Sequence, residues 1–170
     1  EVSLALSDNY LKQVNQYSAS IDELSKFLHQ TMPEGHPYAK IKASPVPEVP
    51  PKLWLLGTSG RSAELAAEKG LSYAFGHFMT DFNGEEIVAN YRREFIEKHD
   101  EKPDVIIAIH AICAETTEKA HELAKSTLAW SLLQEKGQGD LRIPSLEGVD
   151  AYHWTAEDLD KMERRKNKMV

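Results

Sequence analysis

Residues 51–78, PKLWLLGTSGRSAELAAEKGLSYAFGHF, constrain the fold more than any other part of the chain. An apolar run from Leu53 to Leu56 is followed by a turn of small residues and by a helix-forming segment that ends at Gly70. A second apolar segment, residues 71–75, follows directly. Two short strands joined by a helix are expected to be parallel, with a right-handed crossover. The stretch therefore predicts a βαβ unit whose strands are buried on both faces.

The turn after the first strand, Gly57-Thr58-Ser59-Gly60, has two interpretations. N–H groups at the start of a helix are unpaired and lie at the positive end of the helix dipole, so such a turn can bind an anion. The hydroxyls of Thr58, Ser59 and Ser62 could then donate to a phosphate. Alternatively, Ser59 simply caps the helix expected over residues 61–69. The residue types alone leave both interpretations open.

The same residues resemble a known protein family. The segment LLGTSGRSAELAAEKGL and the strand ending in FGHF are similar to the luciferase-like flavin monooxygenases, in particular to the bacterial luciferase-family oxidoreductases. The resemblance is sharp between Pro50 and Phe78 and extends loosely from His36 to Arg165. Thr58 departs from the family pattern, in which serine is usual, but it retains the hydroxyl group.

The resemblance implies an α/β fold that is part of a (β/α)8 TIM barrel. A complete barrel needs about 250 residues, and only three segments of this 170-residue chain have clear strand character. We therefore expect about three parallel strands with flanking helices, without the N-terminal half of the barrel and its last βα unit. The expected order is a helix (1–31), a proline-rich loop (32–51), βα units (52–135), and a loop with a terminal helix (136–170), all in one barrel fragment.

The resemblance also implies a function for a longer parent protein. That protein would be a flavin-dependent monooxygenase or oxidoreductase acting on an unknown organic substrate with O2. Reduced FMN is the expected cofactor, a deazaflavin is the alternative, and a flavin reductase is a candidate partner. In the family, the turn after the first of these strands contacts the flavin phosphate, and residues at the end of the second border the isoalloxazine ring. The cofactor-binding residues implied in this way are Gly57, Thr58, Ser59, Ser62, Gly76 and His77.

No catalytic residue is assigned, because the family's bond-making chemistry also depends on residues of earlier strands. The 170-residue chain alone is therefore expected to be inactive.

Residues 104–112 form the clearest strand pattern of the chain, DVIIAIHAI. Its β-branched residues favour a central parallel strand. His110 lies toward the C-terminal end of this segment, where the functional sites of barrels gather. A structural histidine, buried or at the barrel rim, is the alternative to a functional role for His110.

Four further segments show helical patterns. Residues 7–30 have apolar residues at spacings of three and four, which predicts one helix whose apolar face packs in the core. Ser7 and Asp8 are the expected caps of this helix. Three other helices are expected, each with an apolar face that packs and with charged ends that suit the helix dipole. They cover residues 84–98, Thr117 to Leu133 with Thr116 as the N-cap, and a segment that begins at Thr155 with Asp158 as its capping-box partner.

Composition limits the function classes. The formal net charge is −7 and no basic stripe is present outside the C-terminal tail, which argues against nucleic acid as a partner. No apolar run approaches the length of a membrane span. The single cysteine, Cys113, allows no internal disulfide, as expected for a cytoplasmic protein. No CxxC, HExxH, GxSxG or GxGxxG motif is present, so no metal site is expected.

Two other function classes remain open. Three strands of an open parallel sheet leave unpaired edges, so the chain could be a non-catalytic module or a stable proteolytic core that forms homo-oligomers. A complete small α/β protein, flavodoxin-like in architecture, could bind a phosphorylated ligand at the turn of Thr58 and Ser59. This last interpretation needs more strands than the sequence pattern provides.

Overall fold

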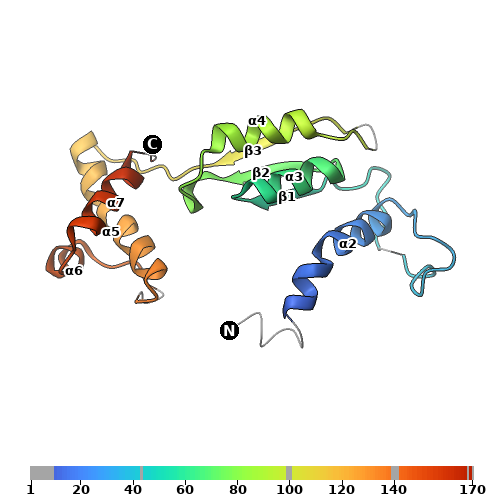
Figure 1. Cartoon of the computed structure of the whole chain (residues 1–170), viewed down its shortest axis with the longest axis horizontal. Helices are drawn as coiled ribbons and strands as arrows, with labels where there is room; N and C mark the ends of the chain where they lie inside the picture. The colour runs from blue at the N-terminus through green and yellow to red at the C-terminus, as the bar shows by residue number, and fades with distance from the viewer. Residues whose placement is uncertain (1–9, 43, 99–100, 139–141, 168, 170) are drawn as a thin grey trace. The chain divides into compact units, whose positions relative to one another are not determined.

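The computed structural model describes residues 10–42, 44–98, 101–138, 142–167 and 169 (Figure 1). The chain divides into two compact units. The first unit comprises Glu1–Phe75 and Gly84–Ile106, and the second comprises Gly76–Asn83 and Ile107–Val170. Each unit is described separately below.

The first unit is built on a three-stranded sheet. Its strands are β1 (Trp54–Gly57), β2 (Ser72–Gly76) and β3 (Val105–Ala108), in the order β1-β2-β3. β1 and β2 are parallel, and their register places Gly57 opposite Phe75. Helix α3 connects these two strands, which confirms the βαβ unit and the expectation of three strands.

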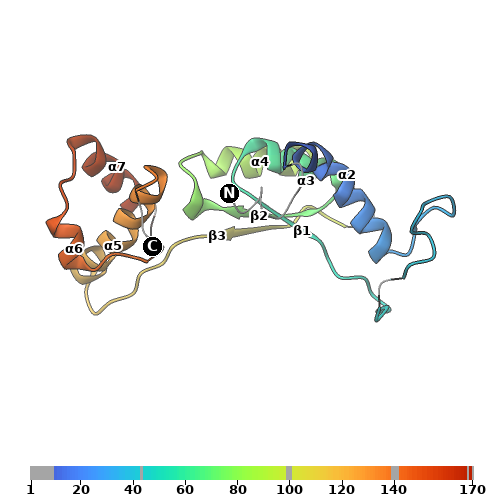
Figure 2. The ribbon, with the colours of Figure 1, turned by 90° about the horizontal axis from the view of Figure 1, so that it is seen from below.

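Helices α3 (Gly60–Lys69) and α4 (Gly84–Glu94) lie on one side of the sheet (Figure 2). Between the helices and the sheet is a buried core formed by Leu55, Ala63, Ala66, Ala67, Tyr73, Phe75, Ile87 and Tyr91. Gly70 ends α3 with a left-handed φ of 66°, as its place after the helix predicts. α4 ends earlier than expected, so Lys98 does not lie at its C-terminus.

The expectation that the strands are buried on both faces was wrong for β1. Leu55 lies in the core, but its neighbour Leu56 is 61% exposed. Alternate residues of a strand point to opposite faces of the sheet. Because α3 and α4 cover one face only, Leu56 and Trp54 lie on the open face.

The expectation for residues 104–112 was also wrong in part. Only Val105–Ala108 form a strand, and in the order β1-β2-β3 this strand is at an edge, with β2 in the centre. Ile106 and Ile107 are each more than half exposed. Helix α5, which follows in the chain, contributes its buried residues to a different core from the one that contains Leu55, Tyr73 and Phe75.

Helix α2 (Tyr10–Leu28) precedes the sheet, and the expected caps Ser7 and Asp8 lie outside the described residues. The expectation that its apolar face packs internally was only partly correct. Ile21 packs against the core of the first unit, but Tyr17 and Leu24 are about half exposed. An ion pair of 2.6 Å between Asp22 and Lys69 joins α2 to α3. The described part of the proline-rich loop has no helix or strand after the end of α2.

The second unit is helical. It contains η1 (His77–Met79), α5 (Thr117–Glu135), α6 (Leu146–Ala151) and α7 (Ala156–Lys166). Its buried core consists of Ala124, Leu128, Ala129, Leu132, Val149 and Met162. Leu123 of α5 is 39% exposed although its side chain is apolar. Helix α6 lies in a stretch expected to be a loop.

Two predicted helix starts in the second unit are confirmed. The Thr116 side chain accepts a hydrogen bond from the N–H of Lys119, which caps α5. Thr155 and Asp158 form a capping box at the start of α7. The Asp158 carboxylate also pairs with Lys136 at 2.6 Å, so this buried acid links α7 to the end of α5.

Candidate functional site

The turn between β1 and α3 is held by a reciprocal pair of serines. The Ser59 side chain accepts a hydrogen bond from the N–H of Ser62 at 3.4 Å, and the Ser62 side chain accepts one from the N–H of Ser59 at 3.2 Å. This is a capping box, in which each side chain satisfies the other residue's backbone donor. The prediction that Ser59 caps the helix is therefore confirmed.

The Ser62 hydroxyl is engaged inside the turn. It donates to the carbonyl of Ser59 at 2.7 Å and lies 3.0 Å from the hydroxyl of Tyr73 on β2. Burial raises the pKa of Tyr73, and the hydrogen bond with Ser62 opposes this effect. Both hydroxyls are thus neutral near pH 7, and they anchor the turn to the neighbouring strand.

Gly57 is required by this arrangement. A Cβ added to Gly57 would overlap the side chain of Ser62 and approach the Tyr73 ring within 3.4 Å. The glycine at the end of β1 therefore makes room for the serine that holds the turn.

Several donors of the turn have no acceptor among the described residues. Helix geometry leaves the first N–H groups of α3 without partners, and no hydrogen bond to the N–H of Gly60 or Arg61 is present in this part of the chain. The Thr58 hydroxyl likewise has no partner there. These three donors can bind an oxyanion without disturbing the serine pair.

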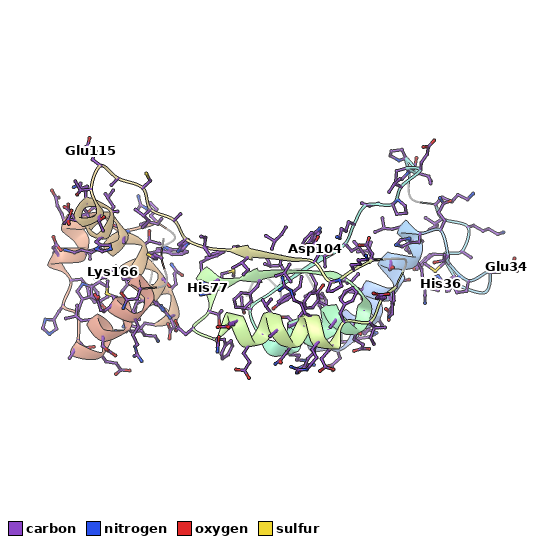
Figure 3. The ribbon with its side chains drawn as sticks, turned by 90° about the horizontal axis from the view of Figure 1, so that it is seen from above. Glu34, His36, His77, Asp104, Glu115 and Lys166 are labelled. Carbon is purple, nitrogen blue, oxygen red and sulfur yellow. The ribbon has the colours of Figure 1, made fainter. Side chains whose placement is uncertain are left out.

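Gly76 and His77, the other two residues implied in cofactor binding, follow the end of β2. Gly76 is the buried last residue of the strand, and His77 begins the short helix η1 (Figure 3). Because β1 and β2 are parallel, both strands end at the same edge of the sheet. His77 belongs to the second unit and the Ser59 turn to the first.

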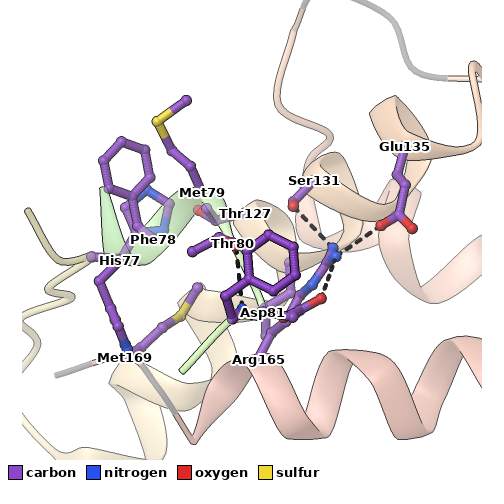
Figure 4. Close-up of a pocket in the computed structure, with 13 residues that line it drawn as sticks. His77, Phe78, Met79, Thr80, Asp81, Thr127, Ser131, Glu135, Arg165 and Met169 are labelled. Carbon is purple, nitrogen blue, oxygen red and sulfur yellow. Dashed lines mark hydrogen bonds and ion pairs between the residues drawn. The ribbon is translucent and has the colours of Figure 1, made fainter. Parts of the chain in front are cut away.

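His77 lines a cavity of about 530 Å3 within the second unit (Figure 4). His110 lines the same cavity, and its ring centroid lies 4.7 Å from that of Phe78. The structure therefore brings together the two histidines that follow β2 and β3. The remaining lining residues are Met79, Thr80, Asp81, Phe82, Thr127, Leu128, Ser131, Glu135, Arg165 and Met169.

Arg165 forms the polar side of this cavity. Its guanidinium donates to Ser131 at 3.1 Å, to Glu135 at 2.8 Å and to Asp81 at 3.2 Å (Figure 4). Burial lowers the pKa of Arg165, but the bonds to Glu135 and Asp81 more than offset this effect, and the net pKa is raised. The bonds from Lys161 and Arg165 lower the pKa of Glu135. The arginine is therefore a neutralised anchor rather than a free cation.

The sequence patterns missed this role of Arg165. The basic residues at the end of α7 were expected to serve the helix dipole, and the side chain of Arg165 is instead only 19% exposed. The partners Asp81 and Arg165 are 84 residues apart in the chain, so no local signal could have paired them.

Within the described residues, no group of three or more His, Cys, Asp or Glu side chains is arranged to hold a metal ion. In the same part of the chain, no helix combines the length and the apolarity that crossing a bilayer requires.

Comparison with known proteins gives the family. Residues 20–169 match the family described as Luciferase-like monooxygenase. The Bacillus subtilis protein YceB is 39% identical over 168 residues, which are 98% of this chain and 50% of YceB. The N-acetyl-S-alkylcysteine monooxygenase of the same organism is 30% identical over 151 residues, covering 87% of this chain and 44% of that enzyme.

A solved structure supports the fold. The crystal structure of apo-MsnO8 superposes with a TM-score of 0.65 at 23% identity, covering 94% of this chain and 55% of the other. Such a likeness supports the α/β architecture of parallel strands with flanking helices. The chain spans about half the length of the curated relatives that it matches. Because the family match covers residues 20–169, most of its length, the chain belongs to the luciferase-like monooxygenase family.

Proposed function

We propose that the protein containing this chain is a flavin-dependent monooxygenase that oxidises a small organic substrate with O2. Family membership supports the monooxygenase class. The observation that carries the flavin assignment is the turn at Thr58 and Ser59, where two N–H groups and a hydroxyl lack acceptors among the described residues. A helix N-terminus of this kind suits a phosphate.

In this proposal the residues of the turn divide their roles. Thr58 and the N–H groups of Gly60 and Arg61 bind the FMN phosphate, together with the Ser59 hydroxyl. Ser62 holds the turn in place through its bonds to Ser59 and Tyr73. Gly57 provides the space that Ser62 needs.

The residues at the end of β2 and just after it are proposed to contact the flavin ring. Gly76 and His77 border the isoalloxazine ring, as the family resemblance implies. When bound, the flavin supplies the oxygen chemistry, and the protein supplies binding, orientation and exclusion of water. A deazaflavin is the alternative cofactor, and a flavin reductase is the proposed source of reduced flavin.

The cavity beside His77 indicates the kind of substrate. Its apolar side chains, Phe78, Met79, Phe82 and Leu128, suit an alkyl or aryl group. Arg165, the one arginine among its described lining residues, is neutralised by two carboxylates. We therefore propose a substrate with an apolar group, as in the S-alkylated amino acid named for one of the relatives. The arrangement does not favour a highly charged substrate.

The test is binding of FMN and of riboflavin, followed by fluorescence quenching, to the full-length protein. Riboflavin lacks the phosphate, so the ratio of the two affinities isolates the contribution of the turn. Thr58→Val should weaken FMN binding by roughly 1–3 kcal/mol, the value of a hydrogen bond to a charged group, and leave riboflavin binding unchanged. Equal effects on both ligands would refute the phosphate role.

A second variant separates phosphate binding from helix capping. Aspartate caps helices as well as serine does, so Ser59→Asp should keep the turn folded while its charge repels the phosphate. It should abolish the preference for FMN over riboflavin. The 170-residue chain alone is expected to bind neither FMN nor riboflavin tightly. Titration of the full-length protein with 8-hydroxy-5-deazaflavin tests the alternative cofactor.

One observation favours a second candidate function, a non-catalytic oligomerising module. The open face of the sheet carries Trp54, Leu56 and Ile106, all of them exposed, and β1 and β3 are its edges. Exposed edge strands promote pairing between chains. Light scattering on the isolated chain tests this candidate, because a monomer at all accessible concentrations would exclude it.

A further inference from the structure

A second cavity lies in the first unit, at the edge of the sheet opposite to the Ser59 turn. It has a volume of about 300 Å3. Its walls come from the C-terminal part of α2, from residues 50–53 before β1, and from residues 69–72, where α3 ends and β2 begins. His29 and Thr31, which follow α2, and Lys98 and Glu101 complete the described lining. The cavity therefore lies at the amino ends of the first two strands.

The lining of this cavity is positively charged. Four lysines, Lys26, Lys52, Lys69 and Lys98, face two carboxylates, Asp22 and Glu101. The whole chain, in contrast, has a formal net charge of −7. A local excess of lysines on an acidic protein attracts anions to this point.

Ion pairing satisfies only half of the lysines. Lys69 pairs with Asp22 at 2.6 Å. Lys52 pairs with Glu101 at 3.4 Å and with Asp104 at 3.0 Å, the residue labelled just before β3 in Figure 3. For Lys26 and Lys98, by contrast, no carboxylate among the described residues lies within ion-pair distance.

A buried hydroxyl in the same lining is a second, independent observation. Ser72 is 2% exposed, and its Oγ has no hydrogen-bond partner among the described residues. Buried hydroxyls without a partner are uncommon, and each requires an explanation such as a bound ion or water. Ser72 opens β2 and lines the cavity together with the lysines.

We infer that this cavity binds a small dianionic oxyanion of the phosphate class, either free phosphate or a small phosphate monoester. The ammonium groups of Lys26 and Lys98 supply the uncompensated positive charge. The Ser72 Oγ has less than 1 Å² of accessible surface, and we infer that its side chain rotates on binding so that the hydroxyl donates to one oxygen of the anion. The ligand would link α2 to the start of β2, so its binding stabilises the first unit. This inference is independent of the flavin proposal, because it concerns the opposite edge of the sheet.

The test is a calorimetric titration of the full 170-residue chain with inorganic phosphate, with glycerol 3-phosphate and with chloride, at constant ionic strength. Saturable binding of one phosphate or one phosphate ester per chain is expected, and their relative affinities identify the source of the anion. Chloride should produce no saturable heat. Equal responses to all three ligands would show only general ionic screening and overturn the inference.

Paired variants locate the site. K26Q/K98Q should weaken phosphate binding at least about tenfold, as expected for losing a charge-assisted hydrogen bond. K40Q/K125Q removes the same number of charges from exposed lysines outside the cavity and should leave the affinity within about twofold. If both pairs weaken binding equally, the effect is one of net charge and the inference is wrong.

Three serine variants complete the design. Ser72→Ala removes only the hydroxyl and should weaken phosphate binding severalfold with an unchanged circular dichroism spectrum. Its control, Ser20→Ala, removes an exposed hydroxyl of α2 outside the cavity and should leave the affinity for inorganic phosphate unchanged. Ser59→Asp reports on the turn at the other edge of the sheet. Loss of phosphate binding in Ser59→Asp but not in K26Q/K98Q would place the anion at the turn instead and overturn this inference, without touching the flavin proposal.

Discussion

The side chain of Ser62 fills the space that a Cβ on Gly57 would occupy. This relationship joins the last residue of β1 to the third residue of α3. It explains why a glycine ends the strand even though its backbone needs no left-handed conformation.

Gly57→Ala is expected to destabilise the chain by about 1–3 kcal/mol, because the new methyl group displaces Ser62 and overpacks the turn. Chemical denaturation measures the change. The matched control is Gly60→Ala, where an added Cβ meets nothing within 4 Å and alanine favours the helix. If both substitutions have the same effect, the contact with Ser62 has no energetic importance.

Gly70→Ala should be more destabilising than Gly137→Ala. Both glycines have left-handed φ values, 66° and 68°, so both variants incur about 1–2 kcal/mol of backbone strain. Only at Gly70 would the added Cβ also approach a backbone oxygen, that of Ile96, within 2.6 Å. The difference between the two free energies of unfolding therefore measures the steric term alone, and a difference near zero would contradict the packing described here.

Ser59→Ala should cost about 1 kcal/mol of stability, because it removes the cap of α3. Thr58→Val should be nearly neutral for stability, since the Thr58 hydroxyl has no partner among the described residues. The change in melting temperature of each variant shows which of the two hydroxyls stabilises the folded chain. A large loss in Thr58→Val would mean that this hydroxyl has a structural partner.

Asp158 should make the stability of the second unit depend on pH in the acid range. The hydrogen bond from Lys136 and the N–H of Thr155 lower the pKa of Asp158 from 3.8 to about 2. A lowered folded-state pKa contributes stability that is complete above the unfolded pKa and is lost as the pH falls through the folded one. Unfolding free energy should therefore decrease between pH 4 and pH 2 in the parent chain.

The control for this prediction is Asp158→Asn, which retains the capping geometry and cannot titrate. Its unfolding free energy should be lower at pH 6 and should change less between pH 4 and pH 2. Identical slopes for the two proteins would show that another carboxylate determines the acid sensitivity.

Local features of the fold could be predicted from the sequence. The caps at Ser59, Thr116 and Thr155 and the left-handed Gly70 were all identified correctly. Each of these features depends on hydrogen bonds or backbone angles within a few residues, so the local sequence is sufficient to predict it.

Burial could not be predicted in the same way. Leu56, Ile106 and Leu24 have the residue types of core positions, yet each is largely exposed. Whether such a residue is covered depends on elements distant in the chain, and helices α3 and α4 of the first unit lie on the same face of the sheet. The partial barrel thus remains a prediction, whereas the parallel βα architecture is confirmed.

The candidate site could be predicted only where its residues are neighbours in the sequence. The turn at Thr58 and Ser59 and the position of His77 follow from a contiguous motif, although their binding roles stay predictions. The cavity that joins His77 to His110 and Arg165 requires three segments to meet, and only the structure shows that they do.

The two hydrophobic cores have no buried residue in common. Tyr91 belongs to one and Leu132 to the other, so truncating both side chains should produce the simple sum of the two individual losses. Heating should accordingly melt the chain in two calorimetric steps, with a van't Hoff enthalpy smaller than the total heat absorbed. A single melting temperature would then describe neither half of this protein.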